Sequence, residues 1–251
     1  MAGRRAGAPV AVKLVGVFPG NAELGLDPHP ATICLLDAST GRALAVMDGE
    51  AITGLRTAAA AALSVRALAR SDARVLAVVG SGVQARAHLR LLPLVRDFTD
   101  VRLVARDPDA PARLGVAAGG TDGADVVCLT TSSSSPVLLA ADVAPGTHVT
   151  SVGFAPPGGE LDPALAASAR LFVETRQAFS PPPAGCAELA GLDPSSGTEL
   201  GEVLLGRAPG RSDDSEITVY KAMGHVAEDA AAAELVYRTA LDRGAGRSLE
   251  L

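Results

Sequence analysis

The segment from Arg74 to His88, "RVLAVVGSGVQARAH", constrains the fold of this chain more than any other segment. It begins with a run of branched aliphatic residues, which is typical of a buried strand. Gly80, Gly82 and Ala85 follow in the pattern G-x-G-x-x-A, and the residues after them alternate small and polar as on a helix. A strand, a glycine-rich turn and a helix in this order predict a binding site for a dinucleotide.

The spacing of the small residues gives each of them a physical role. A helix that begins directly after the glycines directs free N–H groups and a partial positive charge at whatever binds there. Gly80 permits the tight turn, Gly82 leaves room for a diphosphate, and Ala85 lets the helix pack on the strand. The motif alone also occurs by chance in α/β proteins. Here, however, a second strand follows at the expected distance, at Val101–Val104.

The end of that second strand bears on which dinucleotide would bind. An NAD site usually places a carboxylate there, against the ribose hydroxyls. This sequence reads "VRLVARDPDAP", so Arg106 follows the strand and Asp107 comes later, at the start of a turn. A guanidinium binds phosphate oxygens in pairs, and Arg106 therefore favours the 2′-phosphate of NADP. A solvated arginine is common at strand ends, so NAD stays open.

Composition excludes several classes of function. The chain has 251 residues, of which 48% are hydrophobic, so it can bury a core as one large or two small domains. The net charge is −6 and no basic block is present, which argues against nucleic acid as a partner. Cys34, Cys128 and Cys186 are far apart. They predict no disulfide framework, the scattered histidines predict no metal site, and we expect a reducing cytoplasm.

No membrane segment or signal peptide is predicted. The apolar run after Arg56 is mostly alanine and meets Arg66 within ten residues, well short of a membrane span. Near the N-terminus, Lys13 interrupts the apolar stretch that follows the basic pair, which argues against a secretory leader.

Apolar runs and turn residues predict the order of the elements. Two strands are expected at 10–18 and 31–40, with a hairpin turn into a third strand in "ALAVMD". A helix is expected at 50–69, and the alanine-rich tail at 221–243 is predicted to be helical. Between them, strands alternate with helices, and "ADVVCLTT" and "THVTSVG" are further strands. Such alternation indicates a parallel sheet with covered faces.

The predicted fold class is α/β, with a Rossmann-type parallel sheet domain and a smaller α+β domain. We place the dinucleotide-binding domain at 71–214. The smaller substrate and dimerisation domain is expected to combine 1–70 with 215–251, because neither end of the chain holds enough strands alone.

Several longer segments occur in an order that resembles a known family. They are "KLVGVFPGN", "GLRTAAA", "VVGSGVQARAHL", "GTELGEVLLGRAPGR" and "EITVYKAMGHVAEDAAAAELVYR". The chain resembles the ornithine cyclodeaminase/mu-crystallin family over nearly its whole length. The resemblance implies a homodimer that binds NAD or NADP and acts on a small amino or imino acid. Activities in that family include ornithine cyclisation with loss of ammonia, alanine dehydrogenation and reduction of cyclic imines such as pyrroline-2-carboxylate.

The resemblance also implies roles for individual residues. Lys13 matches the active-site lysine that contacts the carboxylate or imine region of the substrate. The positions that match cofactor contacts, in addition to Gly80, Gly82 and Arg106, are Arg56, Thr57, Val83, Gln84, Thr131, Val152, Gly153 and Met223. Arg56 and Thr57 would face the phosphates, and Val152 and Gly153 the nicotinamide. Plainer readings are a strand-edge lysine, a helix-surface arginine and, around Thr131, a flexible serine loop.

One departure from the family pattern bears on the reaction. Ornithine cyclodeaminases carry an acid/base aspartate just after the "VG" of this region, whereas this chain reads "SVGFAPPGGELDP". Phe154 and Ala155 stand in its place, so no obvious group is available to deprotonate an amine. Imine reductases of the family often have an aromatic residue and a proline here. Reduction of an imine needs a cationic anchor, a well-placed hydride donor and a proton.

Other departures concern the scaffold. Ala222 replaces a serine, and Pro28 stands where a family threonine touches the cofactor. Only twelve residues precede Lys13, so the chain is expected to be shortened at its N-terminus, with Arg4 or Arg5 as candidates to replace a substrate-binding arginine. Only "GVAAGGTD" stands where the family has a further helix and strand. We therefore expect the Rossmann sheet to lack an element and to leave an apolar face open.

Three functions follow from these observations. The first is NAD(P)H-dependent reduction of a cyclic imino acid, with Lys13 as the catalytic-site residue. The second is an ornithine cyclodeaminase or amino-acid dehydrogenase, which needs the missing acid/base. The third is a protein that binds the nucleotide or a carboxylate ligand without turnover.

Overall fold

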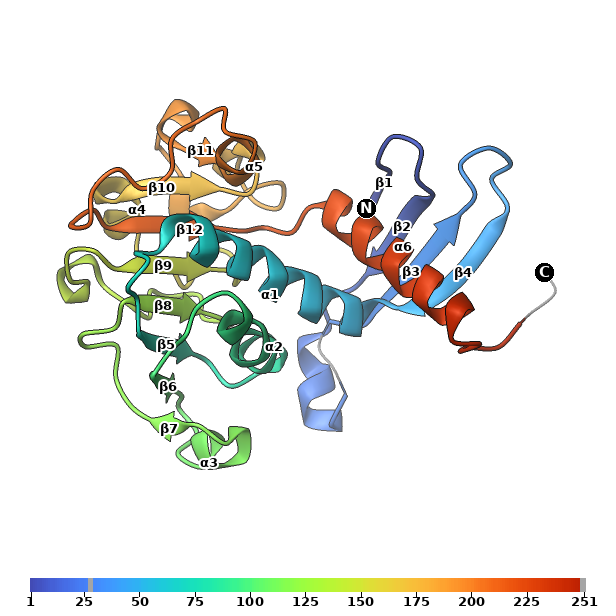
Figure 1. The fold of residues 1–251 in the computed structure, drawn as a ribbon. Helices are drawn as coiled ribbons and strands as arrows, with labels where there is room; N and C mark the ends of the chain where they lie inside the picture. Colours follow the sequence, from blue (N-terminus) through green and yellow to red (C-terminus); the bar gives the residue numbers. More distant parts are fainter. Residues whose placement is uncertain (27–28, 249–251) are drawn as a thin grey trace. The chain divides into compact units, whose positions relative to one another are not determined.

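The computed structural model describes residues 1–26 and 29–248. The chain forms two compact units, Met1–Arg56 with His225–Leu251 and Thr57–Gly224, which we call the small unit and the large unit. Figure 1 shows the elements of each.

The unit boundaries lie at other residues than the domain boundaries expected at 70/71 and 214/215. Helix α1 (Gly49–Leu68) continues past the boundary at Arg56, and strand β12 (Thr218–Lys221) belongs to the large unit. Both differences have the same origin, because the end of α1 and all of β12 pack with the large parallel sheet.

The large unit is built on a sheet of eight strands in the order β11-β10-β12-β9-β8-β5-β6-β7. All of its strand pairs are parallel, so the predicted α/β class is confirmed. In addition to β12, the strands are β5 (Val75–Val79), β6 (Asp100–Val104), β7 (Ala117–Ala118), β8 (Val126–Leu129), β9 (His148–Ser151), β10 (Arg170–Val173) and β11 (Thr198–Glu199).

Short helices connect these strands. The α-helices after α1 are α2 (Val83–Leu91), α3 (Ala110–Leu114), α4 (Pro163–Ser168) and α5 (Leu200–Leu204). The 3-10 turns are η2 (Leu92–Leu94), η3 (Ala140–Asp142), η4 (Arg176–Phe179), η5 (Ala187–Leu189) and η6 (Pro194–Ser196). The helix expected directly after the glycines therefore forms as α2, and the 3-10 turn η2 follows it at once.

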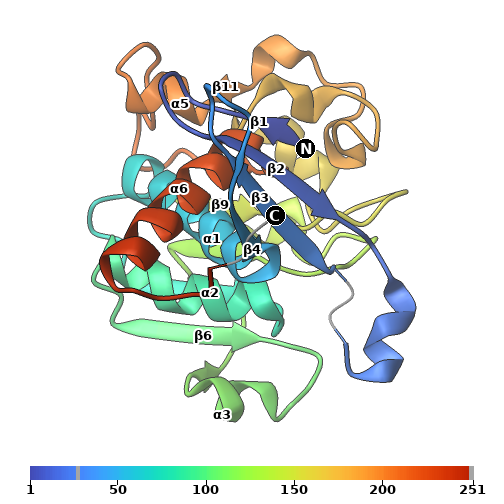
Figure 2. The ribbon, with the colours of Figure 1, turned by 90° about the vertical axis from the view of Figure 1, so that its right-hand side faces the viewer.

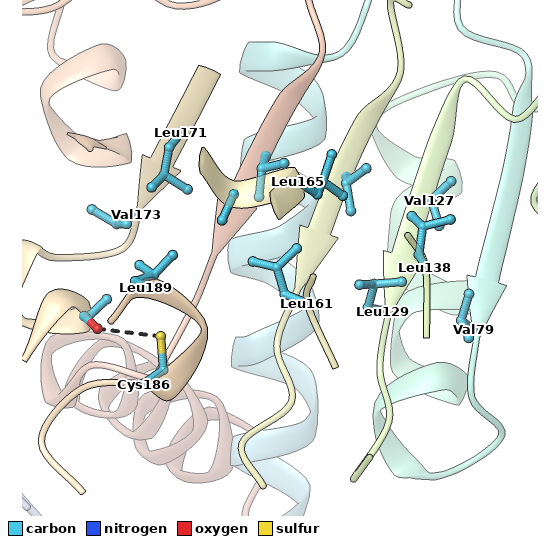
Figure 3. Close-up of a cluster of buried hydrophobic side chains, with 14 of the residues drawn as sticks. Val79, Val127, Leu129, Leu138, Leu161, Leu165, Leu171, Val173, Cys186 and Leu189 are labelled. Atoms are coloured by element: carbon cyan, nitrogen blue, oxygen red, sulfur yellow. Dashed lines mark hydrogen bonds between the residues drawn. The ribbon is translucent and has the colours of Figure 1, made fainter. Parts of the chain in front are cut away.

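Side chains of β5 alternate between the two faces of the large sheet, and on each face they pack in a buried apolar cluster. Leu76 and Val78 pack in a cluster with Val65 of α1 and Ala85 of α2. On the other face, Ala77 and Val79 belong to a cluster with the leucines around α4 and η5, shown in Figure 3. The expected open face of the sheet is thus absent around β5.

Alanine supplies much of the buried surface of α1 in the large unit. Ala58, Ala61 and Ala62 are buried along this helix, and Val65 and Leu68 continue the same side. The residues "GVAAGGTD" form only the two-residue strand β7 and a loop into β8. The tail was predicted to be helical from Lys221. Lys221 is instead the last residue of β12, and the helix begins only at Val226.

The small unit is a four-stranded antiparallel sheet with one helix on it. Its strands are β1 (Ala2–Gly3), β2 (Val10–Val15), β3 (Ala31–Leu36) and β4 (Ala43–Asp48), with a 3-10 turn η1 (Pro19–Leu24) after β2. Figure 2 shows helix α6 (Val226–Asp242) lying along the sheet. Ile33 and Leu35 of the sheet meet Ala230 and Ala233 of α6 in a buried cluster.

The other face of the small sheet carries apolar side chains that are partly or largely exposed among the described residues. Val12, Cys34 and Val46 are paired across β2, β3 and β4 and so share one face. Val46 is 63% exposed and Leu14 is 65% exposed. No described helix has both the length and the apolar character that crossing a bilayer demands.

Candidate functional site

The N-terminus of α2 has the open geometry that a diphosphate requires. Gly82 is the N-cap residue, and no side chain caps the helix. A Cβ atom added at Gly82 would meet nothing within 4 Å. Free N–H groups and the positive end of the helix dipole therefore face open space. Gly82, Val83 and Gln84 are the residues that would hold a dinucleotide phosphate here.

Gly80 makes the tight turn between β5 and α2. Its φ angle is +119°, a conformation that L side chains rarely adopt. A Cβ atom here would also lie 2.7 Å from Thr130 Oγ1. Ala85, fully buried, packs the helix against the strand. The turn thus has the geometry that the sequence motif predicts.

At the tip of β6, an arginine is available and the nearby carboxylate is engaged. Arg106 is exposed, and within the described ranges it has neither a hydrogen-bond partner nor an ion-pair partner. Asp107 accepts a hydrogen bond from Arg113 Nη2 at 2.5 Å. That hydrogen bond lowers the pKa of Asp107. The carboxylate is therefore held away from the role of a ribose ligand, and Arg106 remains free to meet an anion.

The ends of β8 and β9 bring three of the predicted cofactor residues together. Thr131 follows β8, and Val152 and Gly153 follow β9, the neighbouring parallel strand. All three donate hydrogen bonds to the carboxylate of Glu160, which is fully buried. Its Oε2 accepts from Thr131 N at 2.6 Å and Thr131 Oγ1 at 2.8 Å. Its Oε1 accepts from Val152 N at 3.1 Å and Gly153 N at 2.6 Å.

A second buried charge lies beside Glu160. Lys221, the last residue of β12, donates from Nζ to Ser151 Oγ at 3.1 Å, Gly153 O at 2.7 Å and Glu188 Oε1 at 2.8 Å. Met223, two residues further on, is partly buried against the apolar cluster of β9. Sequence reasoning did not identify Glu160 or Glu188. The only local signal was a glutamate directly after two glycines in "PPGGELDP".

The predicted substrate lysine forms a buried ion pair in the small unit. Lys13 is 3% exposed, and its Nζ lies 2.7 Å from Asp229 Oδ2 on α6. Arg56 Nε lies 3.2 Å from the other oxygen of Asp229, and Arg56 Nη1 lies 2.9 Å from Glu228 Oε2. Lys13 and Arg56 therefore both form ion pairs with the carboxylate of Asp229. Thr57, next on α1, is buried.

Sequence reasoning also missed Asp229 and Glu228. Their signal was weak: two adjacent acids in an alanine-rich helix read most simply as a solvated face. Asp229 is instead fully buried, one residue before Ala230 and four before Ala233, which pack on the sheet.

Comparison with known proteins identifies the chain. The sequence pattern of the ornithine cyclodeaminase/mu-crystallin family matches residues 2–244. The protein belongs to this family. Mouse ketimine reductase mu-crystallin is 35% identical over 90% of this chain and 74% of its own length. The iminosuccinate reductase of Paracoccus denitrificans is 35% identical over 96% of this chain and 80% of its own length.

Solved structures of the family have the same fold. Thermococcus litoralis Δ1-pyrroline-2-carboxylate reductase, in complex with NADH and L-proline, superposes with a TM-score of 0.87 at 29% identity over 96% of this chain and 81% of its own. The Paracoccus denitrificans enzyme with NAD+ gives 0.87 at 34% identity over 100% and 83%. An archaeal alanine dehydrogenase dimer with bound NAD gives 0.85 at 30% identity over 98% and 82%.

The departures from the family pattern occupy defined places. Phe154, at the position of the cyclodeaminase aspartate, is 41% exposed. Arg5 donates to Glu234 Oε2 on α6 at 2.5 Å, whereas Arg4 is exposed. Ala222 is buried, and Pro28 lies outside the described residues.

Two buried thiols of this family member are poor nucleophiles. Burial raises the pKa of Cys128 to about 12 and that of Cys186 to about 11. Cys186 Sγ donates to Ala178 O at 3.4 Å (Figure 3). In residues 1–26 and 29–248, no three His, Cys, Asp or Glu side chains gather in a way that would hold a metal ion.

Proposed function

We propose that this protein is an NAD(P)H-dependent oxidoreductase that reduces the C=N bond of an imino acid. A cyclic imino acid of the pyrroline-2-carboxylate type is the substrate class that we favour. The observation that carries this proposal is Phe154, an aromatic residue at the position where a deaminating relative needs a carboxylate, in a chain that keeps a lysine, Lys13, at the family's lysine position. The named relatives support it, since they reduce ketimines, iminosuccinate and pyrroline-2-carboxylate.

The large unit would hold the nucleotide. The free N–H groups at the start of α2 bind the diphosphate, and Gly82 keeps the approach open. Thr131, Val152 and Gly153 lie at the carboxyl ends of β8 and β9, the edge at which open parallel sheets bind ligands. When bound, a reduced nicotinamide supplies the hydride.

Arg106 would select the form of the nucleotide. Its guanidinium is exposed at the tip of β6, and the nearby Asp107 is engaged by Arg113. A 2′-phosphate offers oxygens that a planar guanidinium binds in pairs, whereas a bare ribose does not. We therefore propose NADP as the preferred cofactor, with NAD as the alternative that the test must include.

Lys13 would hold the carboxylate of the imino acid. An ammonium group has three donors, and Asp229 is its only ion-pair partner among the described residues. The cluster of Lys13, Arg56, Asp229 and Glu228 carries two positive and two negative charges, so its formal charges cancel. The substrate is then held by directed N–H donors rather than by excess positive charge. The proton comes from water or from an iminium that is already protonated.

The protein would act as a homodimer. Val12, Cys34 and Val46 form an apolar row across the small sheet, and Leu14 and Val46 are more than half exposed. An apolar sheet face of this kind is stabilised when a second sheet covers it. A second copy of this chain is the occupant that we propose, as in the alanine dehydrogenase dimer of similar fold. The free cysteines suit the cytoplasm.

The proposal is tested by following oxidation of NADPH and NADH with pyrroline-2-carboxylate and, in parallel, ammonia release from ornithine with NAD+. Imine-dependent oxidation is expected. Ammonia and proline from ornithine would instead indicate a cyclodeaminase. Saturable nucleotide binding with neither reaction would indicate a binding protein, and no nucleotide affinity would reject the reductase, the cyclodeaminase and a nucleotide-binding protein.

A further inference from the structure

A cluster of buried charges lies at the carboxyl ends of the central strands and takes no direct part in the proposed chemistry. Glu160 and Lys221 are fully buried, and Glu188 is 3% exposed. Resting on the proposed function, we propose that Glu160, supported by Lys221, is a positioning residue. It fixes Thr131, Val152 and Gly153 and thereby sets the distance between the hydride donor and the imine carbon.

Glu160 joins two strand ends through one carboxylate. Its Oε2 serves the residue after β8, through the backbone N–H and hydroxyl of Thr131. Its Oε1 serves the end of β9, through Ser151 Oγ and the N–H groups of Val152 and Gly153. A buried carboxylate is tolerated when its oxygens accept several hydrogen bonds. Here those bonds lie at the ligand-binding edge of the sheet, so the burial of this charge orders that edge.

The peptide groups of Gly153 are held at both ends. The N–H of Gly153 donates to Glu160 Oε1 at 2.6 Å, and its C=O accepts from Lys221 Nζ at 2.7 Å. A Cβ atom at Gly153 would lie 2.3 Å from Thr131 O and 2.7 Å from Glu160 Cδ. The two hydrogen bonds therefore restrain rotation of both peptide planes, and the site has no room for a side chain. This rigidity places the surface under the nicotinamide within the tolerance that hydride transfer needs.

Replacing Glu160 with glutamine tests this arrangement because both carboxylate oxygens accept backbone N–H groups. In either orientation, the amide NH₂ of Glu160→Gln faces a donor: Thr131 N on one side, or Val152 N and Gly153 N on the other. One strand end must then be released. Glu188→Gln is the matched control, because its amide oxygen can still accept from Lys221 Nζ.

The first measurement is hydrogen exchange at the amides of residues 131, 152 and 153 in the protein without nucleotide. In Glu160→Gln we expect exchange at least about ten-fold faster than in the wild type or Glu188→Gln at the released strand end, either at residue 131 or at residues 152 and 153. The change should be smaller at Val152 than at Gly153, because the N–H of Val152 also donates to Leu129 O at 3.2 Å. The second is kcat and KM for pyrroline-2-carboxylate, with the deuterium isotope effect from 4-deuterated NADPH. In Glu160→Gln, kcat should fall by about 10- to 100-fold with a larger isotope effect, while the KM for the imine changes little.

Should Glu160→Gln fail to fold, Ser151→Ala takes its place. This change removes one donor to Glu160 and one acceptor of Lys221. We expect a kcat several-fold lower and faster exchange at residues 152 and 153. Unchanged exchange and unchanged kcat in a folded variant would overturn the positioning role. An inactive wild type that shows the expected exchange pattern would instead overturn the proposed reaction and leave the positioning of the strand ends supported.

Discussion

Asp229 Oδ2 lies 2.7 Å from Lys13 Nζ, and both side chains are buried in the small unit. The other oxygen of Asp229 lies 3.2 Å from Arg56 Nε. The carboxylate of Asp229 on α6 therefore forms ion pairs with two cations, one from β2 and one from α1. A buried charge pair contributes little to stability, but leaving one of its members alone is costly. This asymmetry makes the pair accessible to experiment.

Replacing Asp229 with asparagine should lower the free energy of unfolding by about 3–5 kcal/mol, because Lys13 and Arg56 would stay buried with less compensation. Urea unfolding measures this loss. The double variant Lys13→Met/Asp229→Leu should lose less free energy of unfolding than Lys13→Met and Asp229→Leu lose in sum. The reason is that the double variant removes both charges of the pair. Additive losses would contradict the coupling between these residues.

Replacing Lys13 with alanine should raise the KM for the imino acid strongly while nucleotide affinity stays close to that of the wild type. The reason is that, in the proposed function, the ammonium group of Lys13 donates to the substrate, whereas the proposed nucleotide-binding residues of α2 and of the tip of β6 belong to the large unit. Steady-state kinetics and fluorescence titration with NADPH separate the two effects. Lys13→Arg, which keeps the charge, is the control. An unchanged KM would refute the anchoring role.

Replacing Arg106 with alanine should weaken NADPH binding about ten-fold or more and leave NADH binding nearly unchanged. A charge-assisted hydrogen bond to a phosphate contributes about 1.5–3 kcal/mol, and NADH has no 2′-phosphate to lose. Dissociation constants for both nucleotides provide the measurement. Arg90→Ala is the control, because Arg90 is an exposed arginine in the last turn of α2, at the opposite end of that helix from Gly82. Equal losses for the two nucleotides would remove the argument for NADP.

The protein should lose stability as the pH falls below about 6.5. Burial lowers the pKa of His148 to about 3 and that of His88 to about 4, from an ordinary value of 6.5. The unfolded chain then takes up protons that the folded protein does not, and unfolding is favoured by about 1.4 kcal/mol per pH unit for each histidine.

Urea midpoints at pH 7, 6 and 5 check this acid sensitivity. His148 contacts Ser64 Oγ at 3.1 Å and Thr218 Oγ1 at 2.9 Å as a neutral ring. His148→Gln should reduce the pH dependence by one proton, even if stability at pH 7 is lower. Equal stability at pH 7 and pH 5 would show that these histidines are protonated in the folded protein.

Replacing Val46 with lysine should convert the proposed dimer into a monomer. Val46 is 63% exposed at the β4 end of the apolar row on the small sheet, and a buried ammonium at a sheet-to-sheet contact would have no partner. Sedimentation velocity measures the change. Leu94→Lys is the matched control, since Leu94 is 76% exposed in the large unit. A Val46→Lys protein that remains dimeric would place the interface elsewhere.

Local patterns in the sequence predict the nucleotide-binding half of the fold well. The aliphatic run of β5, the turn at Gly80 and the start of α2 at Val83 are consecutive in the chain, so the physics of neighbouring residues is enough to identify them. The position of Arg106 at the tip of β6, two residues after Val104, could be read from the same kind of local pattern. Strands β2, β3 and β4 of the small unit were likewise predicted from apolar runs and turn residues, whereas the two-residue strand β1 was not.

The buried charges could not be predicted in this way because they meet through long-range pairing. Glu160 and Thr131 are 29 residues apart, and Lys221 and Ser151 are 70 residues apart. They meet only because β12 lies beside β9 and β9 beside β8. A single sequence does not specify that strand order, and β12 was not predicted as a strand: its last residue, Lys221, was placed at the start of a helix. Asp229 was missed for a similar reason, since the apolar sheet that it faces comes from the opposite end of the chain.

The alanines along α1 have a consequence for how this protein can change. Ala58 and Ala61 are fully buried, and a methyl group has no rotamer freedom to lose when it is packed. At these two residues the helix backbone therefore lies close to its neighbours. Neither residue has a large side chain whose truncation would leave a cavity. Enlarging either alanine to valine or leucine would force atoms apart, typically at about 1–3 kcal/mol. Substitutions by larger residues are thus disfavoured at the buried alanines of α1. Substitutions that reduce side-chain volume are possible only at the larger buried residues beside them, Val65 and Leu68.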